Sequence, residues 1–152
     1  MIVALENIRS LYNVGAILRS ASFFGVSEVF LVGVTGSRKI GGQRWLHEGL
    51  AKTALGAEWQ LQIKILKDSQ KLCDLAKKNG LKLVVVEQTA GATPLSSFRP
   101  GKNMVLVFGN EVTGVSQKVL AAADKVVEIP RRGKKTSLNV AVAAGIVLSR
   151  LG

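Results

Sequence analysis

Short apolar runs rich in valine, isoleucine and leucine recur along the chain and alternate with segments of helical periodicity. The runs are apolar at successive positions, which is typical of parallel strands that are buried on both faces. The segments between them repeat apolar residues every three or four positions, as amphipathic helices do. This alternation predicts an α/β fold in which a mostly parallel sheet is covered by helices on both faces.

The expected elements follow from these patterns. Strands are predicted at residues 2–5, 29–34, 61–65, 81–86, 104–108 and 126–129. Helices are predicted at residues 13–24, 68–79, 116–122 and 137–151. The stretch 88–102 is broken by glycine and proline and is predicted to be a connection. The chain has 152 residues, and no repeat or linker divides it, so residues 1–152 are expected to form a single domain.

The first and last expected helices differ in character. In the first, Asn13 stands where an N-cap belongs and Gly25 where a helix ends, and Arg19 lies away from the apolar stripe. On spacing alone, Arg19 is an ordinary solvated arginine. The last helix is apolar on almost every side, which indicates burial within the protein or at a subunit interface. A homodimer would cover such a helix.

The charge balance indicates a polyanionic partner. There are 21 basic and 10 acidic residues, a net charge of +11, and such an excess favours association with nucleic acid. Two clusters stand out, and they comprise Arg131, Arg132, Lys134 and Lys135, then Arg38, Lys39 and Arg44. Glycines in both stretches favour loops that contact nucleic acid over a merely solvated face. With only 5% aromatic residues, a stacking platform for single-stranded bases is not expected.

Other site classes are excluded by composition. The only histidine is His47, so neither an imidazole relay nor a typical zinc site is available, and no metal is expected. The only cysteine, Cys73, cannot form an internal disulfide and fits a reducing compartment. Residues 133–137 resemble a phosphate-binding loop, but Glu128 stands where that loop requires glycine. Without a membrane span or signal peptide in the sequence, a cytoplasmic protein with no membrane contact is expected.

Three segments carry polar residues among apolar or glycine neighbours: 13–26, 106–116 and 129–148. Ligands bind beyond the carboxyl ends of parallel strands, so these segments are expected to meet at one site. Glu111 has a local alternative as a surface acid near a helix start, and Ser137 as an N-cap. Asn139 opens an apolar helix and has no such simple explanation.

Together the segments resemble the signature motifs of the SpoU/TrmH-type RNA methyltransferases of the SPOUT superfamily. The motifs are NVGAILR, GNEVTG and SLNVAVAAGIVL, in the family's order, and KTALGAE (52–58) resembles a further family stretch. The resemblance implies S-adenosylmethionine as methyl donor and a ribose 2′-hydroxyl of transfer or ribosomal RNA as acceptor. It also implies a C-terminal trefoil knot, and a homodimer whose interface contributes to the active site.

The resemblance also assigns roles by position. Arg19 matches the family's catalytic arginine, and the other residues expected in catalysis are Asn13, Glu111, Ser137 and Asn139. Cofactor contacts map to Glu87, Gln88, Gly109, Ile129, Ser137 and Leu138. RNA contacts are expected at Arg9, Arg131, Arg132, Lys134 and Lys135.

Two questions stay open at this level. Deprotonating an arginine at pH 7 would cost on the order of 7 kcal/mol, so Arg19 suits a phosphate clamp that stabilises the nascent alkoxide better than a general base. The alternative function is a nonenzymatic RNA-binding or assembly factor with the same fold, which would not require the complete polar set. Methylation of a base atom is disfavoured by these motifs.

Overall fold

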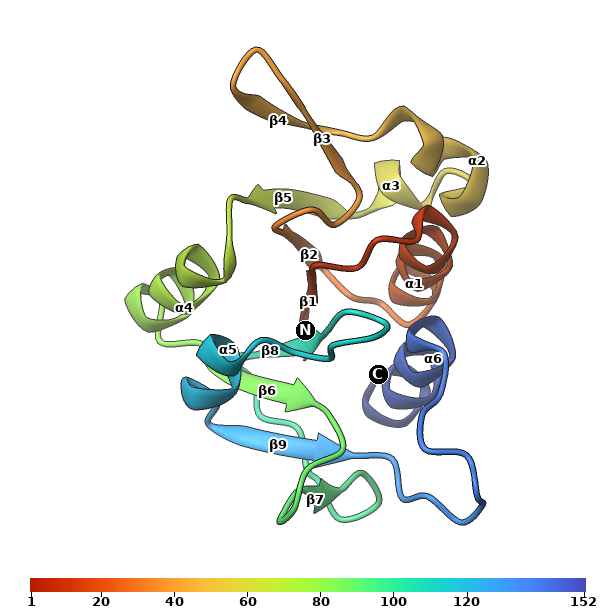
Figure 1. Ribbon diagram of the computed structural model, residues 1–152, viewed down its shortest axis with the longest axis vertical. Helices are drawn as coiled ribbons and strands as arrows, with labels where there is room; N and C mark the ends of the chain where they lie inside the picture. The colour runs from red at the N-terminus through yellow and green to blue at the C-terminus, as the bar shows by residue number, and fades with distance from the viewer.

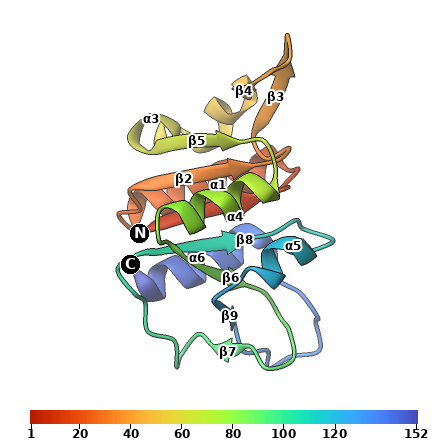
Figure 2. The same cartoon turned by 90° about the vertical axis from the view of Figure 1, so that its left-hand side faces the viewer.

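The computed structural model describes residues 1–152 and contains a fully parallel sheet in the order β5-β2-β1-β8-β6-β9-β7. The strands are β1 (Ile2–Glu6), β2 (Glu28–Val32), β5 (Gln62–Leu66), β6 (Lys82–Val86), β7 (Thr93–Pro94), β8 (Met104–Phe108) and β9 (Lys125–Glu128). All the pairings in this sheet are parallel, so all carboxyl ends lie along one edge, and Figure 2 shows β2, β5 and β8 running the same way. The predicted α/β architecture is confirmed.

Helices cover both faces of this sheet (Figures 1 and 2). One face carries α1 (Leu11–Phe23) and α6 (Val140–Leu151), and the short helices η1 (Glu48–Leu50), α2 (Ala51–Ala54) and α3 (Ala57–Gln60) lie beside α1. The other carries α4 (Ser69–Lys78) and α5 (Gln117–Ala121). Successive strand residues point to opposite faces, so Val3 and Leu5 join the core under α1 while Ala4 joins the core under α4.

Two expected helix starts were wrong, and the side chains explain why. The helix α1 begins at Leu11 because the hydroxyl of Ser10 accepts the N–H of Asn13 at 3.3 Å. The N-cap of α6 is Asn139, whose Oδ1 accepts the N–H groups of Ala141 at 2.8 Å and Val142 at 3.3 Å. Asn13 is therefore inside its helix and its side-chain amide does not cap it, and Ser137 is not an N-cap.

A two-stranded antiparallel hairpin was missed within the basic stretch around Arg38. It consists of β3 (Ser37–Ile40) and β4 (Gln43–Leu46), joined by Gly41 and Gly42. Both glycines have positive φ, +55° and +86°, as a tight two-residue hairpin turn requires. The Gly-Gly pair was the available signal. The short strand β7 was also missed, inside the expected connection 88–102.

Of the two expected ways to bury the last helix, burial on all sides within the single chain does not occur. Ala144, Val147 and Leu148 of α6 are fully buried, but Val142 is 51% and Ile146 is 41% exposed. Only one side of α6 packs on the sheet and α1, which leaves the other side open. None of the helices has the length and hydropathy that a bilayer crossing requires.

The close contact between α1 and α2 depends on Gly15, in the middle of α1. A methyl group there would lie 2.2 Å from Thr53 Oγ1 and 2.6 Å from the Thr53 backbone carbon. The Thr53 hydroxyl also donates to the carbonyl of Leu11 at 3.0 Å, so Thr53 lies directly against the first helix. This contact joins the NVGAILR and KTALGAE segments physically.

We expect Gly15→Ala to lower the free energy of unfolding by about 1–3 kcal/mol, because the backbone of α2 must move. The matched control is Gly145→Ala in α6, where the nearest atom to the added methyl is Ser20 Oγ at 4.0 Å. The control should stabilise by roughly 0.5–1 kcal/mol, the usual gain for alanine in a helix. Urea denaturation of both variants measures these changes in stability. An unchanged free energy of unfolding for Gly15→Ala would show that the contact between α1 and α2 is loose.

Candidate active site

The loop 109–116, between β8 and α5, folds back tightly on itself. The backbone N–H and C=O groups of Asn110 and Gly114 pair reciprocally at 3.0 Å, and Asn110 Oδ1 accepts the N–H groups of Val112 and Thr113. A methyl group on Gly109 would lie 2.3 Å from Gly114 C and Val115 N. Only glycine fits at residue 109, because its neighbours are backbone atoms that cannot move aside.

Carboxylates at the ends of the two strands that flank β8 accept hydrogen bonds from this loop. Glu6, the last residue of β1, accepts the N–H of Ser116 at 2.9 Å and its hydroxyl at 2.6 Å, and also accepts the hydroxyl of Ser69. Glu87, directly after β6, accepts the N–H of Val115 at 3.1 Å. Glu6 is only 1% exposed, and these donors satisfy its buried oxygen atoms. Sequence reasoning missed Glu6, although an acid ending an apolar strand was a signal.

Glu111 anchors the loop on its other side to the start of α1. Its carboxylate accepts the N–H of Arg9 and of Ser10, both at 3.2 Å, and the side-chain amide of Asn13 at 3.0 Å. Asn139 Nδ2 in turn donates to Asn13 Oδ1 at 3.0 Å. Because Asn139 Oδ1 caps α6, the orientation of both amides is fixed. Three segments far apart in sequence thus meet in one hydrogen-bonded chain.

These donors determine the charge of Glu111. Burial acts to raise its pKa, but the amide of Asn13 and the backbone N–H groups of Glu111, Arg9 and Ser10 together lower the pKa below its ordinary value. Glu111 is therefore ionised at neutral pH. A carboxylate with a lowered pKa is a weak base, so it is better suited to holding position and charge than to removing a proton.

A cavity of about 330 Å³ lies beside this chain of hydrogen bonds, at the carboxyl ends of β6, β8 and β9. All six residues expected to contact the cofactor line it, namely Glu87, Gln88, Gly109, Ile129, Ser137 and Leu138. Its apolar walls include Val86, Phe108 and Val140. Among the 15 lining residues, the only ionisable side chains are the carboxylates of Glu87 and Glu111.

The expected site residues are not all brought together. Asn13, Glu111, Ser137 and Asn139 lie at or beside the cavity. Arg19 does not: it is exposed on α1, in a shallow hollow formed with Ala16, Ser20, Phe23 and Phe24. Spacing placed Arg19 correctly off the packed stripe, but the single chain does not carry it to Glu111.

The basic residues expected to bind RNA occupy two positions. Arg131, Arg132, Lys134 and Lys135 are exposed in the loop before α6, next to the cavity residue Thr136. Arg9 is exposed beside the carboxylate of Glu111.

No group of three or more histidine, cysteine, aspartate or glutamate side chains is placed to hold a metal ion. Cys73 lies on α4, where burial and then the charge of Glu6 raise the pKa of its thiol.

The match to known families decides the identity of the fold. The model of the SpoU rRNA Methylase family matches residues 1–149. The chain belongs to this family. It is 30% identical over 97% of its length to the tRNA (guanosine(18)-2′-O)-methyltransferase of Aquifex aeolicus, of which it covers 66%. The family predicted from the three motifs is therefore confirmed.

Solved structures of this SpoU family agree. The A. aeolicus TrmH/SpoU tRNA modifying enzyme superposes with a TM-score of 0.82 at 28% identity, covering 98% of this chain and 72% of the other. An AdoMet-bound rRNA methyltransferase from Sinorhizobium meliloti superposes with a TM-score of 0.84 at 26% identity. The match covers 98% of this chain and 54% of the other. The chain spans between about half and two thirds of the length of the curated relatives it matches.

We expect Glu111→Gln to lower the free energy of unfolding by about 1 kcal/mol at pH 7. This is less than the loss of a buried, charged hydrogen bond would cost, because the Glu111 side chain is exposed and water screens its charge. The folded-state pKa is lowered, so this contribution is complete above the unfolded pKa of about 4.3. It is lost as pH falls through the lower folded pKa, where wild type and variant should converge.

Urea denaturation from neutral to acidic pH measures that difference. The control is Glu128→Gln, which removes the same charge at a side chain that accepts no hydrogen bond in the structure. If the difference in unfolding free energy between wild type and Glu111→Gln stays constant into the acidic range, Glu111 is not ionised and hydrogen-bonded as described.

Proposed function

We propose that the protein is an S-adenosylmethionine-dependent methyltransferase that methylates a ribose 2′-hydroxyl in transfer or ribosomal RNA. The observation that carries this is the charge of the cavity. The protein has a net charge of +11, yet the cavity offers only the carboxylates of Glu87 and Glu111. Such a site favours a ligand with a positive centre, while the basic exterior favours a polyanionic substrate.

The residues present fit a sulfonium nucleoside. The apolar wall of Val86, Phe108 and Leu138 suits an aromatic base. S-adenosylmethionine would supply a methyl group on a positively charged sulfur. In the proposed transfer, the 2′-oxygen forms a bond to the methyl carbon, the carbon–sulfur bond breaks with its electrons going to sulfur, and the hydroxyl proton leaves to solvent.

The chain of hydrogen bonds from Glu111 to Asn139 would contribute by alignment. It holds the loop of β8, the start of α1 and the start of α6 in fixed relative positions, so the walls of the cavity cannot drift apart. Fixing two reactants in line is worth about 7–11 kcal/mol of the barrier in favourable cases. In this proposal Ser137 and Asn139 lie beside the bound ribose, and Glu111 keeps its negative charge at the cavity.

A homodimer would complete the site, because the cavity of one chain lacks a cation. The helices α1 and α6 lie side by side on one face of the sheet (Figure 1), and each exposes a stripe of large side chains. These are Tyr12 and Phe23 on α1, with Val142 and Ile146 on α6, and Arg19 lies on the same exposed side of α1. We infer that a second copy covers these stripes and that Arg19 of one copy serves the cavity of the other as a phosphate clamp.

Three further expectations belong to the same proposal. The basic loop 131–135 would contact RNA phosphates beside the cavity, together with Arg9. The segment before α6 would pass through a loop to form the trefoil knot of the family, which base rates alone argue against. A cytoplasmic location follows from the RNA substrate and from a single cysteine that needs no oxidising compartment.

The decisive experiment is donor binding by calorimetry, followed by transfer of labelled methyl groups into total RNA. We expect label on ribose 2′-oxygens, which digestion to nucleosides identifies. RNA binding without donor binding or label would instead support the nonenzymatic RNA-binding or assembly factor. Label on a base would support base methylation.

The role of Arg19 across the dimer is testable by mixing inactive subunits. We expect Arg19→Ala to abolish transfer with little change in donor affinity, and Arg19→Lys to rescue poorly because a point charge does not replace a planar fork. Asn139→Ala should also be inactive. If Arg19 acts in the partner's site, a mixed dimer of the two variants contains one intact site.

Random pairing puts about half of the subunits in mixed dimers, so the mixture should recover roughly a quarter of wild-type activity. The control is each variant mixed with itself, which should stay inactive. An inactive mixture, with mixed dimers demonstrated by mass spectrometry, would show that Arg19 does not act across the interface.

A further inference from the structure

The β3–β4 hairpin exposes large apolar and basic side chains to solvent. In its register Arg38 is opposite Trp45, so these side chains share one face, and Ile40 lies on the same face two residues along. Trp45 is 54% and Ile40 is 48% exposed. The opposite face carries Lys39 and Arg44, again directly opposite one another. A two-stranded ribbon with an exposed tryptophan and cations on both faces has the character of a binding element.

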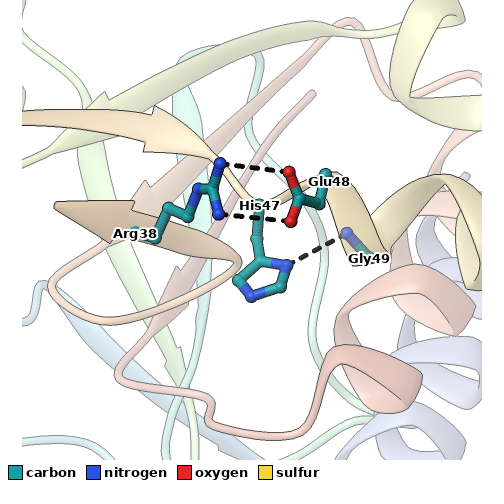
Figure 3. Close-up of polar contacts among 4 residues, drawn as sticks. All are labelled: Arg38, His47, Glu48 and Gly49. Atoms are coloured by element: carbon teal, nitrogen blue, oxygen red, sulfur yellow. Dashed lines mark hydrogen bonds and ion pairs between the residues drawn. The ribbon is translucent and has the colours of Figure 1, made fainter. Parts of the chain in front are cut away.

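Contacts at its base hold this hairpin at a fixed angle. The Arg38 guanidinium forms a two-pronged ion pair with Glu48, with Nη2 at 3.0 Å from Oε2 and Nη1 at 3.2 Å from Oε1 (Figure 3). The N–H of His47 donates to Gly36 O at 2.8 Å, and His47 Nδ1 accepts the N–H of Gly49 at 3.0 Å. Since a hairpin alone is marginally stable, these contacts pre-organise the ribbon and reduce the entropy lost on binding.

Two of the three cations of the hairpin form no ion pair, although Arg44 Nη1 donates a hydrogen bond to Ser37 Oγ at 3.3 Å. Arg38 is engaged by Glu48, but neither Lys39 nor Arg44 forms an ion pair. Residues 37–46 contain three cations and no acid. The tip, Gly41 and Gly42, is open, with no atom within 4 Å of where a side chain would start. A polyanion can therefore approach without repulsion or steric conflict.

The position of the hairpin relates it to the candidate site. It follows β2 at the edge where all the parallel strands end, as does the basic loop 131–135 after β9 (Figures 1 and 2). In the sheet order, β2 and β9 are four inter-strand steps apart, or about 19 Å at ~4.8 Å per step. The carboxylates Glu6, Glu87 and Glu111 belong to β1, β6 and β8, which lie between them.

We propose that the β3–β4 hairpin is a second RNA-binding arm, in which Trp45 stacks on an unpaired base while Lys39 and Arg44 contact phosphates. This rests on the proposed function for the identity of the polyanion as RNA. Unpaired bases stack on exposed aromatic side chains without sequence preference, and phosphates supply the salt-dependent part of the affinity. The hairpin and the loop 131–135 would then hold one RNA on both sides of the cavity.

The two tryptophans of the chain provide a direct test. Trp59 is also exposed, but it lies on α3, which leads into the amino end of β5, at the opposite edge of the sheet. Trp59→Phe leaves only Trp45 to report by fluorescence, and Trp45→Phe leaves only Trp59. Bulk transfer RNA, which has unpaired loops, should quench Trp45 and leave Trp59 unchanged, whereas a short RNA duplex should quench neither.

Affinity measurements test the charges separately. Trp45→Ala should weaken binding of bulk transfer RNA by roughly tenfold, the typical loss of one stacked base. Lys39→Glu with Arg44→Glu should lower the slope of log affinity against log salt by about 1.5, from two lost phosphate contacts. The matched control is Lys77→Glu with Lys78→Glu at the end of α4, on the amino edge, which makes the same change in net charge. Arg132→Glu with Lys134→Glu gives the comparison for the other basic segment.

The outcomes distinguish this inference from the proposed function. If wild type binds RNA and the hairpin variants bind equally well, or no worse than the Lys77/Lys78 control, the hairpin is not an RNA arm. A loss of dimer in the sedimentation of Trp45→Ala would make it a subunit contact and also overturn the inference. Hairpin-dependent RNA binding without methyl transfer would leave the inference standing and overturn the proposed reaction. Unchanged thermal melting and donor binding would show that the variants are folded.

Discussion

The architecture of the site depends on how the loop 109–116 is held. Its backbone returns so closely on itself that Gly109 has no room for a side chain, and its N–H groups would be stranded without acceptors. Carboxylates at the ends of three neighbouring strands supply acceptors or anchors: Glu6 after β1, Glu87 after β6 and Glu111 after β8. A parallel sheet makes this possible because it brings all of those strand ends to one edge.

Using carboxylates for this purpose has an electrostatic consequence. Glu87 and Glu111 concentrate negative charge at the cavity of a protein whose net charge is +11, while cations lie outside it on the loop 131–135 and the hairpin. The same residues that satisfy the loop's backbone therefore separate a region suited to a cationic ligand from regions suited to a polyanion. Hydrogen bonds keep Glu111 ionised, which makes this separation stable at neutral pH.

The sequence was sufficient for the sheet and for most of the cavity, but not for the details at chain reversals. Buried parallel strands are readable because they are continuously apolar, and the six residues matched to cofactor contacts do line one cavity. Helix starts were misplaced because Ser10 and Asn13 are both good caps, and only the three-dimensional position of Glu111 decides between them. Glu6 and the hairpin were not predicted. A single acid or a Gly-Gly pair indicates a structural role only when the residues that it contacts in the fold are known.

The position of Arg19 in the single chain does not explain its expected role in catalysis. Its spacing on α1 correctly separates it from the buried stripe, yet no contact within the chain leads from it to the cavity. A site whose ionisable groups are both acidic cannot by itself neutralise an RNA phosphate or a developing alkoxide. In the proposed reaction, a neutralising cation would come from the basic residues outside the cavity or from a second copy. Arg19 shares the exposed side of α1 with Tyr12 and Phe23, and the proposed second copy would bury this apolar stripe together with that of α6.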